Sequence, residues 1–145
     1  MFEITHTPLE KLDLRKGLVS DHAGAFSSFE GYVRKNNEGK IVSALEYEAH
    51  EVLCRTEAEN ILREVYQKFD VIAAHCFHRV GRLEVGDMAV WVGVIASHRD
   101  ESFKACRYII DQVKRRLPIW KKEYYENGDS GWLACDPCTS RSIFD

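Results

Sequence analysis

The sequence predicts a single-domain α+β protein, a sandwich in which helices pack on a mainly antiparallel sheet. Residues 51–69 and 99–117 place apolar side chains at helical spacing. Four shorter segments are rich in β-branched and aromatic residues, as strands are: 24–34, 41–49, 71–80 and 88–96. The resulting order β-β-α-β-β-α is typical of α+β proteins, because neighbouring strands can pair antiparallel and bury one face under the helices.

The composition fits one globular domain with its own core. The chain has 145 residues, of which 45% are hydrophobic and 30% charged. No apolar run approaches the roughly 20 residues of a membrane-spanning helix, and the first residues lack the features of a signal peptide. The five cysteines are dispersed and odd in number, which favours reduced thiols in a cytoplasmic protein. A net charge of −3 argues against general nucleic-acid binding.

In the first half of the chain we expect a short helix over residues 9–19 and then a strand over 24–34. The polar segment 35–40 contains turn residues, so the strands 24–34 and 41–49 are expected to form a hairpin, with 35–40 as a flexible loop that could close over a site. In the helix 51–69 the apolar side chains form one stripe: Ala58, Ile61, Leu62, Val65 and Phe69.

In the second half, 71–80 is a predicted strand and 84–87 a turn. The nearly all-apolar segment 88–96 predicts a central strand. In the helix that follows, the expected buried stripe is Phe103, Cys106, Ile110, Val113 and Leu117. Ser97 and Asp100 match an S-x-x-D capping pattern. After Pro118 we expect a short helical or irregular segment, a loop at 127–131 and a possible last strand at 132–134.

A basic cluster gives the strongest indication of function. Five cations fall within nine residues, 114–122, of a chain that is acidic overall. Pro118 should end the helix near Leu117, so Lys114 and Lys121 would lie on either side of a bend and could point into one cleft. Two converging ammonium groups suggest an anionic substrate or activation of a carbonyl or thiocarbonyl group. The alternative is an exposed basic face at a helix end, which the helix dipole favours.

Other candidates are weaker when taken singly. His98 and Arg99 lie where a strand passes into a helix, and the free N–H groups there could bind a phosphate or carboxylate. The alternative is a solvated turn. Arg34 alone is typical of a surface arginine, and His78 of a hydrogen-bonded core histidine.

No metal or redox motif emerges. The six histidines are dispersed and lack the close spacing of zinc ligands. Cys135 and Cys138 form a C-x-x-C, but it lacks the strand–helix context of a redox motif and a second pair of zinc ligands. Two incidental thiols are the preferred interpretation.

Taken together, several blocks resemble the large, catalytic subunit of molybdopterin synthase. The blocks occur in the family's order within about residues 2–133: Phe29–Arg34, Leu45–Ala49, His78–Leu83, Gly86–Asp87, Val92–Arg99 and Lys114–Glu123. Each block alone is weak. A strand ending in S-H-R combined with K-x-x-x-P-x-W-K-x-E is specific.

The resemblance implies a sulfurtransferase of molybdenum cofactor biosynthesis, which converts cyclic pyranopterin monophosphate to molybdopterin. Sulfur would come from the thiocarboxylated C-terminal glycine of a small ubiquitin-like subunit. Two large subunits would form a central homodimer with one small subunit at each end, a heterotetramer. The implied fold is an α/β-hammerhead-like domain over residues 1–134, followed by an irregular tail, 135–145. No metal or organic cofactor is implied, because the sulfur arrives on a protein.

The resemblance also implies roles for individual residues. Lys114 matches the lysine near the thiocarboxylate and Lys121 the lysine near the pterin, and both are expected to be catalytic. The residues expected to bind substrate are these two lysines with Arg34, His98, Arg99 and Glu123. Three of them, the arginines and the histidine, would surround the substrate phosphate, while the carboxylate orients a lysine or an arginine.

Three alternatives stay open. A lysine-dependent Schiff-base lyase or aldolase predicts borohydride trapping of a carbonyl substrate on Lys114 or Lys121. A non-catalytic module that binds RNA or acidic proteins predicts steeply salt-dependent binding. An inactive paralogue is disfavoured by the presence of both lysines together with His98 and Arg99.

Overall fold

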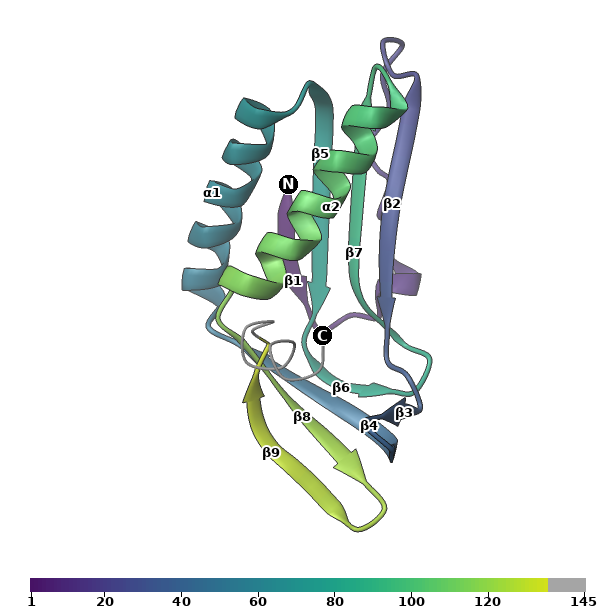
Figure 1. The fold of residues 1–145 in the computed structure, drawn as a ribbon, viewed down its shortest axis with the longest axis vertical. Helices are drawn as coiled ribbons and strands as arrows, with labels where there is room; N and C mark the ends of the chain where they lie inside the picture. The colour runs from purple at the N-terminus through teal and green to yellow at the C-terminus, as the bar shows by residue number, and fades with distance from the viewer. Residues whose placement is uncertain (136–145) are drawn as a thin grey trace.

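Two sheets and two helices form the structure (Figure 1), a computed structural model that describes residues 1–135. The predicted α+β class is confirmed, and the pairing of β1 with β5 is the parallel exception in mainly antiparallel sheets. The elements are β1 (Phe2–Thr5), the 3₁₀ helix η1 (Leu9–Lys11), β2 (Ala25–Tyr32), β3 (Asn36–Asn37), β4 (Lys40–Ala49), α1 (Glu51–Lys68), β5 (Val71–Arg79), β6 (Gly81–Glu84), β7 (Met88–Ala96), α2 (Arg99–Arg116), β8 (Ile119–Tyr125) and β9 (Gly128–Ala134).

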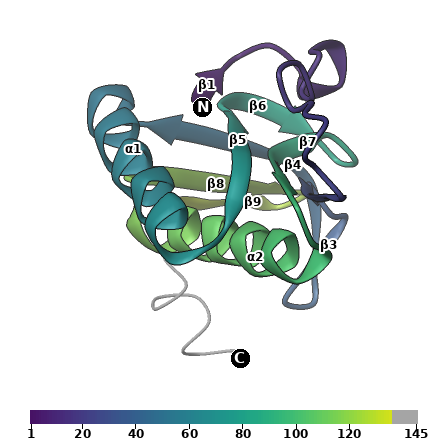
Figure 2. The ribbon, with the colours of Figure 1, turned by 90° about the horizontal axis from the view of Figure 1, so that it is seen from above.

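The four-stranded sheet, in the order β1-β5-β7-β2, forms the main core with both helices on one face (Figure 2). Every residue of β7 is buried, as predicted for a central strand. From α1 the core receives Cys54, Ala58, Ile61 and Val65, and from α2 Cys106, Ile109, Ile110 and Val113. The opposite face is covered by the N-terminal segment, whose Leu9 and Leu18 pack on Phe77 and Trp91.

The second sheet has five strands and extends away from the helices (Figure 1). Its order is β3-β4-β8-β9, and β6 also pairs with β4. Because β8 follows α2 directly while β6 follows β5, this sheet is joined to the helix layer and to the four-stranded sheet. The junction lies at the carboxyl end of α2.

Several predictions about the elements were wrong. Residues 9–19 form only η1, because their leucines spread over the sheet instead of forming one helical stripe. The strand 24–34 pairs with β7 and 41–49 pairs with β8, so they form no hairpin with each other. Residues 36–41 form a small hairpin of their own. The segment after Pro118 is β8, not helical or irregular.

The details at α2 also differ. Phe103 is 63% exposed, and the neighbouring Ser102 is buried in its place. The N-cap is His98 without a side-chain hydrogen bond, so Ser97 and Asp100 do not form the predicted cap. Asp100 contacts Lys104 at 2.9 Å instead. Within residues 1–135, no helix is long and apolar enough to cross a membrane.

Candidate functional site

The bend at Pro118 is fixed by contacts with α1. α2 ends at Leu117, whose backbone is extended. The Leu117 N–H still donates the last helical hydrogen bond, to Val113 O. The Pro118 carbonyl accepts hydrogen bonds from His50 N at 3.1 Å and Cys54 Sγ at 3.5 Å. Since both donors lie at the start of α1, the bend is held against a rigid helix. It leaves Lys114 exposed in the last turn of α2 and Lys121 half-buried in β8.

A buried carboxylate, Glu123, lies two residues beyond Lys121 on the same face of β8. Its residue is 3% exposed. Oε1 contacts Lys121 Nζ at 3.3 Å and accepts from Asn37 Nδ2 at 2.7 Å. Oε2 accepts from Tyr125 Oη at 2.5 Å. Both oxygens therefore have donors, which is the condition under which a buried carboxylate is tolerated.

An irregularity in the β8–β9 pairing lies at Glu123. The register shifts between Lys122 and Tyr124, and Gly131 of β9 has a φ of +69°. Ser130 Oγ accepts a hydrogen bond from the Glu123 N–H at 2.9 Å. A bulge of this kind redirects side chains and is common beside functional sites.

The surroundings keep Glu123 ionised. Burial by itself raises the pKa of this carboxyl group. The hydrogen bonds from Tyr125 and Asn37, together with the positive charge of Lys121, outweigh burial and hold the pKa below its ordinary value. Burial and the same hydrogen bond raise the pKa of Tyr125 to about 12. Tyr125 thus stays a neutral donor, and Glu123 is positioned to orient Lys121.

Arg34 joins the site through Asn37. Its Nη2 donates to Asn37 Oδ1 at 3.3 Å. Asn37 is held by the β3–β4 hairpin, in which Glu38 and Gly39 both have positive φ, 52° and 78°. The segment 35–40, expected as a flexible loop, thus contains a tight turn that anchors one side of the site.

The positive charges of Lys114 and Lys121 both act on one thiol, that of Cys135. Burial raises the pKa of Cys135, and the positive charges of Lys121 and Lys114 oppose this increase. Cys135 is fixed at the end of β9 because its N–H donates to Ile119 O at 3.0 Å. Lys121 contacts Glu123 directly, whereas Lys114 is related to this site through the effect of its charge on Cys135 and His78. The convergence of the two lysines on one cleft stays a prediction. Cys138 lies outside the described residues.

A buried histidine, His78, contacts Tyr47, which pairs with Lys121 across β4 and β8. His78 Nδ1 bonds Arg79 O at 2.8 Å, and since a carbonyl only accepts, Nδ1 is the donor and Nε2 has the free lone pair. Its ring packs edge-to-face against Tyr47, with centroids 5.2 Å apart. Burial lowers the pKa of His78 to about 4, the Nδ1 hydrogen bond opposes that, and the charge of Lys114 adds to the decrease.

His98 and Arg99 lie far from this site within one chain. Both are exposed at the start of α2, whereas Lys114 lies in its last turn (Figure 1). A helix of 18 residues is roughly 27 Å long, at about 1.5 Å per residue. The expected anion pocket of Arg34, His98 and Arg99 therefore does not form inside a single chain. Residues 1–135 also contain no group of three or more side chains arranged to hold a metal ion.

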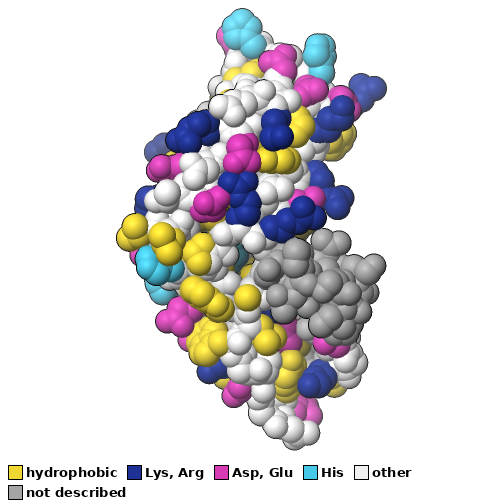
Figure 3. All heavy atoms as spheres, turned by 60° about the vertical axis from the view of Figure 1, so that its left-hand side comes forward, with side chains coloured by type: hydrophobic (Ala, Val, Ile, Leu, Met, Phe, Trp, Pro, Cys, Tyr) yellow, Lys and Arg dark blue, Asp and Glu magenta, His cyan; other side chains and the backbone are white. Residues whose placement is uncertain are grey.

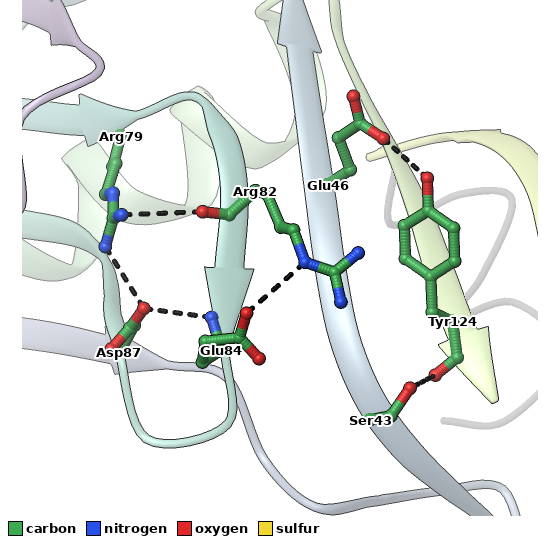
Figure 4. Close-up of polar contacts among 7 residues, drawn as sticks. All are labelled: Ser43, Glu46, Arg79, Arg82, Glu84, Asp87 and Tyr124. Atoms are coloured by element: carbon green, nitrogen blue, oxygen red, sulfur yellow. Dashed lines mark hydrogen bonds and ion pairs between the residues drawn. The ribbon is translucent and has the colours of Figure 1, made fainter. Parts of the chain in front are cut away.

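Polar contacts on the other face of β4 and around the β6–β7 turn hold the strands near the site together (Figure 4). Tyr124 Oη donates to Glu46 Oε1 at 2.6 Å, which ties β8 to β4. Asp87 Oδ2 contacts Arg79 Nη1 at 3.2 Å and accepts from Glu84 N at 2.9 Å, which fixes the β6–β7 turn. The contact between Glu46 and Tyr124 joins the two strands whose opposite face presents Lys121 and Glu123.

Sequence reasoning missed Asn37, Tyr125 and Tyr47. The alternation in β8 was the available signal for Tyr125, because residues 121, 123 and 125 share one face once the segment is a strand. Asn37 has no such signal, since it meets Glu123 only through the pairing of three strands.

The fold and the site together define an α+β protein whose cationic site, built around an oriented lysine, suits an anionic substrate. A family model described as MoaE protein matches residues 4–116. The molybdopterin synthase catalytic subunit of Synechococcus elongatus is 47% identical over 114 residues, covering 78% of this chain and 69% of the relative. That of Thermoplasma volcanium is 38% identical, covering 90% and 95%. The chain belongs to the MoaE family, as the sequence blocks predicted.

Solved structures agree. Molybdopterin synthase from Staphylococcus aureus superimposes with a TM-score of 0.85 at 32% identity, covering 91% of this chain and 96% of that one. A protein–protein complex of subunits 1 and 2 of molybdopterin-converting factor from Helicobacter pylori matches with a TM-score of 0.70 at 22% identity, covering 88% and 87%. The second likeness concerns the fold alone.

Proposed function

We propose that this chain is the catalytic subunit of a molybdopterin synthase. It transfers sulfur from the thiocarboxylated C-terminus of a small ubiquitin-like subunit to cyclic pyranopterin monophosphate, forming the molybdopterin dithiolene. Family membership supports the reaction class. The observation that most supports the site is the ion pair of Lys121 with buried Glu123 in β8, the strand that follows Lys114 and the bend at Pro118.

The charges of the site suit this chemistry. The donor is an anionic thiocarboxylate and the acceptor has a cyclic phosphate. Once the sulfur is bonded to the acceptor, water adds to the acyl carbon, negative charge develops on the acyl oxygen, and the sulfur leaves as a thiolate. Fixed cations in a partly dehydrated site stabilise such charge without reorganising. Lys114 orients and polarises the thiocarboxylate, and Lys121 assists attack or opening of the cyclic phosphate. Glu123 keeps Lys121 in place.

His98 and Arg99 enter the proposal through a second copy of the chain. Their distance from Lys114 along α2 excludes a shared pocket within one protomer. In a homodimer with two-fold symmetry, one protomer can contribute its α2 start to the other protomer's Arg34 and lysines. The functional unit is then a homodimer with two sites, each completed by one small subunit. We place this assembly, built from the domain 1–134, in the cytoplasm.

Reconstitution tests the proposal. Purified protein, thiocarboxylated small subunit and cyclic pyranopterin monophosphate are combined, and molybdopterin is detected by fluorescence after oxidation. We expect product from the wild type and from Lys104→Ala, a control on an exposed turn of α2. Lys114→Ala should bind the small subunit but yield little product, and near-normal turnover would refute its role.

The negative outcomes separate the alternatives. Absence of product despite stable binding of the small subunit indicates an inactive paralogue. Absence of binding as well leaves the Schiff-base lyase, tested by borohydride trapping, and the anion-binding module. On the face shown in Figure 3, basic and acidic side chains are interspersed, which disfavours an extended RNA-binding surface there.

Mixing variants tests the two-copy site. Lys114→Ala and His98→Ala are each expected to be inactive as pure homodimers. After random exchange, half of the dimers are mixed and one of their two sites has both residues, so about a quarter of the wild-type activity should return. Failure of the mixture to regain activity, with exchange verified by mass spectrometry, contradicts the shared site.

A further inference from the structure

The side chain of Asn37 lies between a cation and an anion of the site. Nδ2 donates to Glu123 Oε1 at 2.7 Å, and Oδ1 accepts from Arg34 Nη2 at 3.3 Å. A carboxylate only accepts and a guanidinium only donates, so these two partners together fix the orientation of the amide. Lys121 Nζ lies 3.3 Å from the same Glu123 oxygen. One neutral amide therefore connects the arginine that follows β2 with the lysine of β8.

The backbone around Asn37 is built to hold this amide in place. Asn37 pairs with Lys40 across the two-residue turn Glu38–Gly39. Glu38 has a φ of 52°, which is uncommon for a residue with a side chain, and turns with two positive φ values are the tight hairpin turns. Lys40 lies over the ring of Tyr125, 5.0 Å from its centroid, which joins the hairpin to β8 a second time.

We propose that Asn37 is a positioning residue that sets the separation between the Arg34 guanidinium and the Lys121 ammonium, and thereby how the site holds its anionic substrate. This inference rests on the proposed function and deepens it. A neutral amide is suited to the position because it can donate to the carboxylate and accept from the guanidinium at once. An ionised carboxylate there would repel Glu123, and an alkyl side chain would leave the buried carboxylate with one donor fewer.

The substitution Asn37→Asp converts this role into a pH dependence. It places a second carboxyl group within hydrogen-bond distance of Glu123, and two carboxyls so close share a proton. While protonated, Asp at position 37 donates to Glu123 and accepts from Arg34 as the amide does. Once it ionises, the two carboxylates repel each other. The charged and titratable groups around this position are Glu123, Lys121 and Tyr125 of β8, Arg34 and Glu38 of its own segment, and Lys40 of β4.

Molybdopterin formation is measured from about pH 5.5 to about pH 8.5. Asn37→Asp should be close to wild type at the acidic end and lose about tenfold or more relative to it at the basic end, because a small displacement of positioning groups is costly. Asn37→Ala should be impaired at every pH, with a raised KM for the pterin substrate and unchanged affinity for the small subunit. The matched control is Asn36→Asp, which adds the same charge one residue away at an exposed position of β3 and should follow the wild type.

A second readout does not depend on catalysis. The carboxyl ¹³C resonance of Glu123, assigned by its loss in Glu123→Gln, is titrated by NMR in each variant. Asn37→Asp should show a carboxyl titration above about pH 6 that is absent from the wild type and from Asn36→Asp. In Asn37→Ala the pKa of Glu123 should rise, since it loses a donor.

The outcomes are separable. If the wild type makes no molybdopterin, the proposed function fails while the Glu123 titration still decides the role of Asn37. An activity profile of Asn37→Asp parallel to that of the wild type, or an unchanged Glu123 titration in both variants, overturns the inference. If Asn37→Asp does not fold, Asn37→Ala decides through its KM and the Glu123 titration, with urea unfolding as the check on structure.

Discussion

Replacement of Glu123 by Gln should destabilise the protein and loosen its site. The carboxylate is almost completely buried and accepts from Asn37, Tyr125 and Lys121. Gln keeps the shape and one acceptor oxygen but turns an NH₂ group toward one set of donors. Breaking a buried ion pair costs about 3–5 kcal/mol, and because Lys121 keeps 28% of its side chain in solvent we expect the lower end, about 3 kcal/mol.

The stability difference between Glu123→Gln and the wild type should depend on pH. The folded-state pKa of Glu123 is below its ordinary value of 4.5, so its contribution is fully present above about pH 4.5 and is lost as the pH falls through the folded-state value. Urea unfolding should show a deficit for Glu123→Gln of about 3 kcal/mol at pH 7 that shrinks toward pH 3. Glu126→Gln, at an exposed turn, is the control. Equal stability of Glu123→Gln and wild type at pH 7 would refute the reasoning.

Two further substitutions test the packing around the helices. The pKa of His78 is lowered to about 4. Between pH 6.5 and 4 its imidazole is therefore protonated in the unfolded chain but neutral in the folded one, and the wild type should lose up to about 3 kcal/mol of stability over this range. His78→Asn, which keeps a donor for Arg79 O, should flatten this slope in urea unfolding, and an unchanged slope would contradict it. Glu64 accepts two hydrogen bonds from Arg116 at 2.8 Å, and its pKa is lowered to about 2 by that arginine and Tyr108. Because both side chains are about one-third exposed, Glu64→Gln should cost only about 1 kcal/mol in thermal unfolding, and less in high salt; a loss above about 3 kcal/mol would show that the pair behaves as buried.

The helices and the central strand could be predicted because their signal is local. The apolar stripe of α1 and the continuous apolar run of β7 depend only on spacing along the chain. Phe103 was misassigned because Ser102, whose hydroxyl lies 2.7 Å from Ser27 Oγ, fills the contact between α2 and β2. A buried serine pair cannot be recognised from hydrophobic spacing.

Strand partners could not be predicted in the same way. The polar turn after Arg34 suggested a hairpin between its neighbouring strands, yet β2 and β4 belong to different sheets. β8 was missed because Pro118 and a run of charges resemble a helix end followed by coil. Its burial pattern shows little alternation, since only Ile119 and Glu123 are buried and only Trp120 is exposed. Non-local pairing decides such segments.

The site was predictable only where it depends on local sequence. The end of α2 before Pro118 is a local property and was predicted correctly, whereas the convergence of Lys114 and Lys121 on one cleft stays a prediction. The distance of His98 from them depends on the length of α2, and its position was assigned by resemblance without that geometry. Asn37 could not be assigned to the site from the sequence, because it contacts Glu123 only through the β3–β4 hairpin.

The comparison of Lys121→Ala with Lys122→Ala tests most directly whether sulfur transfer depends on the face of β8 that carries Lys121 and Glu123. The two lysines are consecutive and equal in charge, but Lys121 contacts Glu123 whereas Lys122 lies over the ring of Trp132, 4.8 Å from its centroid. We predict that the rate of molybdopterin formation falls about 100-fold or more in Lys121→Ala and stays within about twofold of wild type in Lys122→Ala. Equal losses in the two variants, or full activity of Lys121→Ala, would contradict the proposed site.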